Sequence, residues 1–143
     1  MKLIQSTWQE IDGYLAMSDG IIIPTGSIEQ HGPMGLIGTD MLCADAISVE
    51  AGEQAKALVA PPLGYGPAEF NMGFAGTISI SLDIYRNLCG EIFSSLERHG
   101  FHHLYVLNGH GANLEPLKDA ASSLQNAQVR IKSWWDFEAV NLL

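Results

Sequence analysis

The chain has 143 residues, of which 47% are hydrophobic and 16% charged, and its formal net charge is −9. This length and balance are typical of one globular domain with a buried core, and they exclude a disordered or membrane-embedded chain. The acidic charge argues against nucleic acid or an anionic membrane as a partner, because both require a basic surface that neutralises phosphate.

Cys43 and Cys89 are the only two cysteines, and each lies in an apolar segment with helical spacing. We interpret them as reduced, buried thiols in a reducing compartment. The first residues lack the pattern of a signal peptide, and no run approaches the ~20 apolar residues of a membrane span. A cytoplasmic location is therefore expected.

Strands and helices are expected to alternate along the chain. Thr7 and Glu10 form a capping box that opens the first helix, and Thr39 and Asn113 are candidate caps of later helices. Helical spacing of apolar residues predicts helices over 41–56 and 82–99, the first with Leu42, Ala46, Ile47 and Val49 toward the core. Short apolar or alternating runs predict strands at 21–23, 58–60, 77–81, 104–107 and 129–133.

This alternation predicts a single α/β domain over residues 1–143. It would have three layers, with a mostly parallel central sheet flanked by helices on both faces. In such sheets ligands bind beyond the carboxyl ends of the strands, so the loops that follow strands are the places to look for chemistry.

Two of these loops carry metal-ligand residues. The segment from Thr25 to Pro33 reads TGSIEQHGP and contains Glu29 and His31, and Asp40 follows nine residues after the histidine. The second segment, LNGHGAN, places His110 directly after the strand expected at 104–107. Carboxylate and imidazole are ligands of divalent transition metals, and both loops should emerge at the same sheet edge.

These four side chains would suit one zinc-like ion, or two ions that share Asp40. Glu29 and His31 point to the same side if the backbone is extended, and His110 would add a second imidazole. Mixed oxygen and nitrogen ligation does not separate Zn, Mn and Fe. Two cations ~3.5–4 Å apart would clamp a bridging hydroxide and polarise a carbonyl, which is metal-assisted hydrolysis. No sequence motif supports serine hydrolysis, phosphoryl transfer or dinucleotide binding.

Residues 24–33 with Thr39-Asp40, residues 108–111 and residues 133–137 together resemble the creatininase (creatinine amidohydrolase) family over essentially the whole chain. The resemblance implies a metal-dependent hydrolase of amide C–N bonds that assembles as a homo-oligomer, often a hexamer. It also implies metal ligation by Glu29, His31, Asp40 and His110, with Asp40 bridging. Trp135 matches a tryptophan that flanks the substrate in creatininase, and packing at the strand end is the alternative role for it. Glu69, in the long Gly- and Pro-rich loop 64–76, is a further candidate for substrate binding, with ordinary loop surface as the alternative.

Two departures from the family pattern bear on function. Ala112 stands where creatininase has an acidic ligand, and relatives continue beyond Leu143 into a segment with a catalytic histidine and an acidic residue. We therefore expect a domain truncated at its C-terminus, either a fragment, or a chain completed by a partner, or a catalytically impaired protein. The proton donor to the leaving nitrogen is not identified.

Three functions follow from these observations. The first is a metal-dependent amidohydrolase that cleaves a C–N bond of a cyclic or non-peptide small-molecule amide. The second is a truncated, impaired family member that serves as a binding or assembly subunit. The third is a metal-free binder of small molecules that uses the same cleft.

Overall fold

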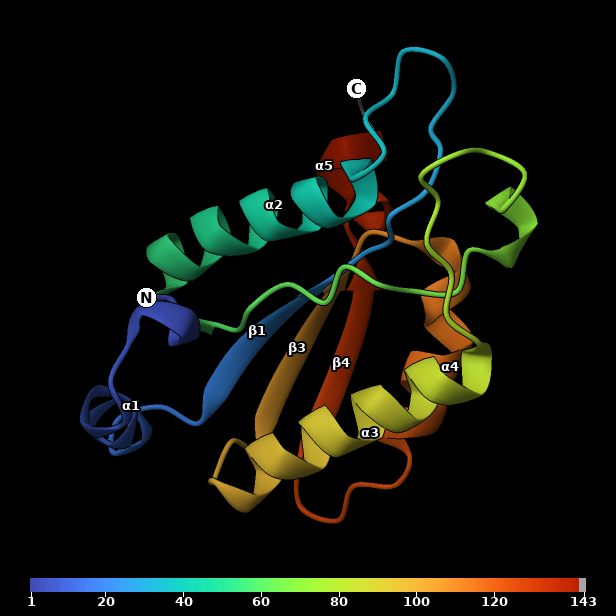
Figure 1. Ribbon diagram of the computed structural model, residues 1–143. Helices are drawn as coiled ribbons and strands as arrows, with labels where there is room; N and C mark the ends of the chain where they lie inside the picture. Colours follow the sequence, from blue (N-terminus) through green and yellow to red (C-terminus); the bar gives the residue numbers. More distant parts are fainter. Residues whose placement is uncertain (142–143) are drawn as a thin grey trace.

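A single four-stranded parallel sheet forms the centre of the protein. The structure is a computed structural model and describes residues 1–141 (Figure 1). The strands are β1 (Gly20–Thr25), β2 (Leu58–Val59), β3 (His103–Asn108) and β4 (Gln128–Ser133), and their order across the sheet is β2-β1-β3-β4. All three strand pairs are parallel, as the alternation of elements predicts.

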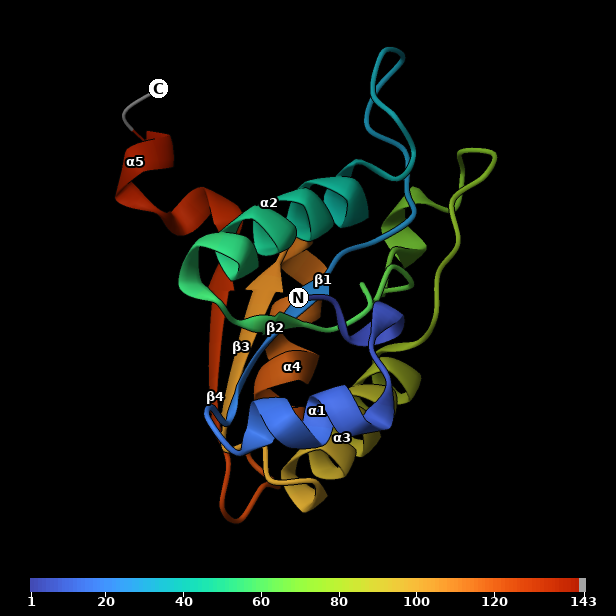
Figure 2. The same ribbon diagram turned by 90° about the vertical axis from the view of Figure 1, so that its left-hand side faces the viewer.

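Helices cover both faces of this sheet, which confirms the expected three-layer α/β fold. The elements are η1 (Leu3–Gln5), α1 (Trp8–Leu15), α2 (Thr39–Ala55), η2 (Glu69–Asn71), α3 (Leu82–Arg98), η3 (Gly111–Asn113), α4 (Leu114–Ala121), η4 (Trp134–Asp136) and α5 (Glu138–Asn141). Helix α2 packs on one face, α3 and α4 lie on the other, and α1 lies beside α3 (Figure 2). No helix within residues 1–141 is both long and apolar enough to cross a membrane.

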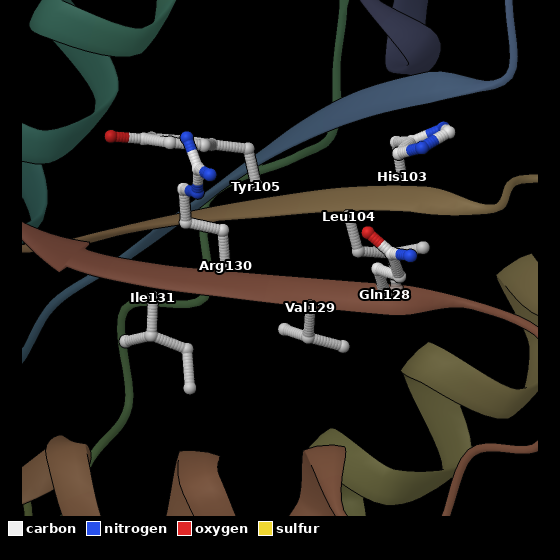
Figure 3. A pocket seen from close by; sticks show the side chains of 7 residues that line it. All are labelled: His103, Leu104, Tyr105, Gln128, Val129, Arg130 and Ile131. Carbon is white, nitrogen blue, oxygen red and sulfur yellow. The ribbon is translucent and has the colours of Figure 1, made fainter.

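The core lies between the sheet and the helices α1, α3 and α4. Ile21 of β1 pairs in register with Leu104 of β3, and both side chains face the core and are almost fully buried. Tyr85 and Phe93 of α3 fill the space beneath them. On β4 the alternation of a strand is visible, because Arg130 projects from one face while Val129 and Ile131 project from the other (Figure 3).

The strand expected at residues 77–81 does not form. Ile78 makes only an isolated antiparallel bridge to Ile28, within a long loop that runs from β2 to α3. Its alternation is the reverse of what a sheet strand needs, because Thr77 is buried and Ile78 is exposed. Both sides of β1 are already paired, to β2 and β3, and this segment runs in the loop outside the sheet.

Helix α2 also presents a different face to the sheet from the one expected. Its buried residues are Ala44, Ser48 and Gly52, together with Asp40 near its start, whereas Leu42 and Ile47 are exposed. The helix lies so close to the sheet that a Cβ at position 52 would overlap the side chain of Val59. Small residues therefore face the strands, and the larger apolar ones are displaced outward.

Three smaller expectations can also be compared with the structure. Thr39 is the first helical residue of α2, and its hydroxyl donates to the Leu36 carbonyl instead of capping the helix. Asn113 precedes α4 but makes no capping hydrogen bond. Cys89 is buried as predicted, whereas Cys43 is only half-buried.

Candidate metal centre

The candidate ligands lie at the carboxyl ends of β1 and β3, the two central strands of the sheet. The chain leaves β1 toward β2 on one side, and leaves β3 toward β4 on the other, so the strand order reverses between them. Ligand sites in open parallel sheets form at this position, because the diverging loops leave a crevice. The loop after β1 carries Glu29 and His31, Asp40 is the second residue of α2, and His110 follows β3.

His110 lies against both candidate carboxylates. Its Nδ1 is 2.9 Å from Oδ2 of Asp40 and 3.2 Å from Oε1 of Glu29. Its Nε2 lies 2.7 Å from the carbonyl oxygen of Pro67, and the side chain is 4% exposed. Because that carbonyl can only accept, it holds Nε2 in the protonated form and leaves Nδ1 to face the carboxylates.

His31 approaches the same aspartate from the other side. Its Nε2 lies 2.8 Å from Oδ1 of Asp40, and its Nδ1 lies 3.0 Å from the backbone carbonyl oxygen of Glu29. Glu29, His31 and Asp40 each offer one ligand atom, and these atoms all lie within 4.8 Å of one another. The Asp40 carboxylate therefore stands between two imidazoles, with one oxygen facing each.

Three side chains of this cluster shift the pKa values of one another. Burial acts to lower the pKa of both histidines, but the hydrogen bonds to Asp40 and to the backbone carbonyls, with the nearby negative charges, raise the pKa of His31 and of His110. Burial likewise acts to raise the pKa of Asp40, but hydrogen bonds from His110, Ser27 and His31 lower it. The cluster thus favours positive charge beside Asp40, which a divalent cation could supply.

The donor set fits such a cation. Two carboxylates and two imidazoles converge, and each imidazole has its remote nitrogen bonded to a backbone carbonyl, as is usual for metal-bound histidine. Glu29, Asp40 and His110 would give three donors to one ion, whereas His31 and Asp40 would give two to a second. Ala112, half-buried in η3, contributes no donor to either position.

The other two candidate residues lie outside this cluster. Glu69 is exposed in η2 and, within the part of the chain that the structure describes, makes no side-chain hydrogen bond or ion pair to the four residues. Trp135 lies in η4 beyond the carboxyl end of β4, where its ring meets the ring of Trp134 edge-on at 5.6 Å. Both residues are at the same edge of the sheet as the cluster, and their role in substrate binding stays a prediction.

Several residues at the centre were not found by sequence reasoning. The buried hydroxyl of Ser27 donates to Oδ2 of Asp40 at 2.9 Å, and the amide of Asn71 donates to Oε2 of Glu29 at 2.9 Å. Asn108 supports the His110 turn, because its amide donates to the His110 carbonyl and its oxygen accepts from the His110 backbone N–H. Ser27 lies inside the TGSIEQHGP segment, which is a signal that could have identified it, whereas no pattern marks Asn71.

A surface hollow elsewhere on the sheet lacks this chemistry. It runs along β3 and β4 from His103 and Gln128, the first residues of these strands, past Tyr105 and Arg130 (Figure 3). No carboxylate lines it, so it offers none of the oxygen ligands that the cluster provides.

The chain is similar to known proteins of one family. The family model for creatininase, described as creatinine amidohydrolase, matches residues 5–142. The chain is 30% identical over 146 aligned positions to creatinine amidohydrolase of Pseudomonas putida, covering 92% of this chain and 56% of that protein. It is 36% identical over 111 positions to the mycofactocin precursor peptide peptidase of Mycolicibacterium smegmatis, covering 73% of this chain and 44% of that protein. The chain thus spans about half the length of these relatives.

Solved structures give the same fold. A crystal structure of creatinine amidohydrolase superimposes with a TM-score of 0.87 at 27% identity, over 94% of this chain and 58% of that one. Creatininase Mn gives a TM-score of 0.87, and a creatininase mutant of Zn–Zn type gives 0.86, with the same identity and coverage.

Proposed function

This chain belongs to the creatininase family, and we propose that it is a metal-dependent amidohydrolase acting on the C–N bond of a cyclic or non-peptide amide. One observation carries the proposal, namely that the Asp40 carboxylate lies between His31 and His110 with one oxygen directed at each. A carboxylate placed in this way can bridge two cations, or hold one cation together with Glu29.

The roles of the protein groups follow from their positions. Glu29, Asp40 and His110 would hold one divalent ion, and His31 would join Asp40 at a second. When bound, such ions supply Lewis-acid chemistry that polarises a carbonyl and lowers the pKa of water. Pro67 and the backbone of Glu29 hold the imidazoles in orientation, and Ser27 orients Asp40 through its hydroxyl. Because the second position has fewer protein donors, we expect its ion to bind more weakly than the first.

Metal removal and restoration tests the activity. Purified protein should hydrolyse a small cyclic amide, for which creatinine is the first probe, and dialysis against a chelator should abolish turnover. Addition of Zn²⁺, Mn²⁺ or Fe²⁺ should restore it, and the metal that restores it best identifies the preferred ion. A linear formamide and a short peptide are the comparison substrates, because relatives include both an amidohydrolase and a peptidase.

The same experiment separates the alternatives. An empty or single metal site without turnover on any probe would favour the binding or assembly subunit. Substrate binding that is unaffected by His31→Ala and by chelation would favour a metal-free binder. Turnover that depends on added metal contradicts both.

We also propose that Trp135 and Glu69 contact the substrate. The chain is further proposed to assemble as a homo-oligomer, with the hexamer that the family resemblance implies as the expected form. Apolar side chains near the centre support assembly, because Met34 is 94% exposed, Phe70 70% and Phe74 55%. Sedimentation of the purified chain tests the assembly, and a monomer at micromolar concentration would contradict it. Trp135→Ala and Glu69→Gln should raise KM without reducing metal content.

A further inference from the structure

The loop 64–76 contacts two of the candidate ligands. The Pro67 carbonyl accepts from Nε2 of His110, and the ring of Phe70 stacks on the same imidazole at 6.1 Å between ring centres, with 13° between the planes. Asn71, two residues after the exposed Glu69, donates its amide to Oε2 of Glu29. This loop therefore supports the candidate centre directly, through residues that are not themselves metal ligands.

Asn71 belongs to a chain of three hydrogen bonds that runs in one direction. The backbone N–H of Gly32 donates to Oε1 of Gln30 at 2.9 Å. The Nε2 amide of Gln30 then donates to Oδ1 of Asn71 at 2.9 Å, and Nδ2 of Asn71 donates to Oε2 of Glu29 at 2.9 Å. The chain thus links a backbone donor to a candidate metal-binding carboxylate through two neutral amides.

The direction of this chain is set at its first member. A backbone N–H can only donate, so the acceptor end of the Gln30 amide must face Gly32. The donor end of Gln30 then faces Asn71, whose acceptor end must receive it, and the donor end of Asn71 is left for Glu29. Neither amide can turn over without placing two donors or two acceptors against each other.

The hydrogen bond divides the two oxygens of Glu29 between different tasks. Oε2 is held by Asn71, whereas Oε1 faces Nδ1 of His110 at 3.2 Å. Oε1 is thereby directed toward the position between Glu29, Asp40 and His110. Holding one oxygen also removes rotational freedom that the carboxylate would otherwise lose on binding a cation.

We propose that Gln30 and Asn71 form an amide relay that positions Glu29 for a divalent cation. Through Asn71, the loop 64–76 would thus help to determine the affinity of the site for metal. The inference rests on the proposed function, because it takes Glu29 as a ligand. Gln30 and Asn71 are positioning residues, and neither donates an atom to the cation.

Two variants test the relay in different ways. Asn71→Leu removes the donor at similar volume. Gln30→Glu keeps the shape of residue 30 and touches no candidate ligand, but it replaces the donor amide with an acceptor, which breaks the bond to Asn71 and frees its amide to turn. An added negative charge near the site would by itself strengthen cation binding, so the relay and simple electrostatics predict opposite signs for this variant.

The readout is the affinity of the purified full chain for Zn²⁺ and Mn²⁺, measured by competition with a fluorescent chelator. Both variants should bind about 10-fold more weakly than the wild type, and the double variant no more weakly than Asn71→Leu alone, because both break one chain of bonds. Asn87→Leu, at an exposed position of α3, is the control and should bind normally.

The possible outcomes distinguish failure of the relay from failure of the proposed metal-dependent function. The relay alone is overturned if the wild type binds metal and both variants bind it with wild-type affinity. It is also overturned if Gln30→Glu binds metal more tightly than the wild type. Wild-type protein that binds neither ion overturns the proposed function and the relay with it. Far-UV circular dichroism checks folding, and Gln30→Glu decides the test if Asn71→Leu does not fold.

Discussion

Nδ1 of His110 lies 2.9 Å from Oδ2 of Asp40, although 70 positions separate the two residues along the chain. The contact exists because β3 pairs with β1 in register, from Gly20 with His103 to Thr25 with Asn108. This pairing brings the turn after β3 beside the beginning of α2.

Asp40 is the residue on which the centre depends most. Asp40→Asn keeps the size of the side chain but removes its charge, so the bridge between the two imidazoles loses one anionic oxygen. Metal content of the purified protein, measured by mass spectrometry of the bound elements, should fall to roughly a tenth or less of wild type. Asp45→Asn, on the same helix, should keep its full metal content, and equal loss in both variants would contradict the assignment.

His110 and His103 provide a matched pair, because they stand near opposite ends of the same strand. His110 is buried among carboxylates, whereas His103 is exposed and pairs with Asp19 at 2.9 Å. His110→Ala should lose zinc binding and, with it, the thermal stabilisation that added zinc gives to the wild type. His103→Ala should retain both. A zinc-dependent shift in Tm that survives in His110→Ala would show that this imidazole is not a ligand.

Gly109 allows the His110 turn to pass close to α2. A Cβ at this position would overlap the backbone carbonyl of Asp40, whereas a Cβ on Gly111 would meet no atom within 4 Å. Gly109→Ala should therefore lower the free energy of unfolding by about 1–3 kcal/mol and also weaken metal binding, because Asp40 must move. Gly111→Ala should change neither in chemical denaturation, and similar effects for both glycines would exclude the steric explanation.

Glu97 ties α3 to the turn before β4. Its carboxylate accepts the backbone N–H groups of Gln125, Asn126 and Ala127 at 3.1, 2.6 and 2.7 Å. The hydrogen bonds from Asn126 and Ala127 lower the pKa of Glu97 below its ordinary value of 4.5. The ionised carboxylate thus stabilises the fold above pH 4.5, and this contribution is lost as the pH falls through the lowered pKa.

Glu97→Gln should accordingly reduce Tm at pH 7, and the difference from wild type should narrow as the pH falls below 4.5. Thermal melts followed by circular dichroism from pH 7 downward measure this trend. Glu91→Gln, at an exposed position of the same helix, is the control and should follow the wild type throughout. A difference that stays constant with pH would show that the charge of Glu97 is not responsible.

Much of the fold could be predicted from the sequence because its signals are local. The capping box of Thr7 and Glu10 forms as expected, and α3 ends at Arg98, two residues before Gly100, which adopts a positive φ of 96°. The strands at β1, β3 and β4 follow from short apolar runs between such helices. The strand prediction for residues 77–81 was wrong because alternation of polar and apolar residues is a local signal, whereas strand pairing depends on the path of the long loop between β2 and α3.

The amino-acid sequence by itself determined the ligand types and their place after strands, since Glu29, His31 and Asp40 lie within twelve residues of one another and His110 follows a recognisable strand. Only the tertiary structure decided that His110 meets Asp40, that Ala44, Ser48 and Gly52 face the sheet, and that Asn71 holds Glu29. Each of these depends on the order of strands or on the path of a long loop. Such contacts join residues far apart in the chain, and their geometry is set by packing that no short window of sequence contains.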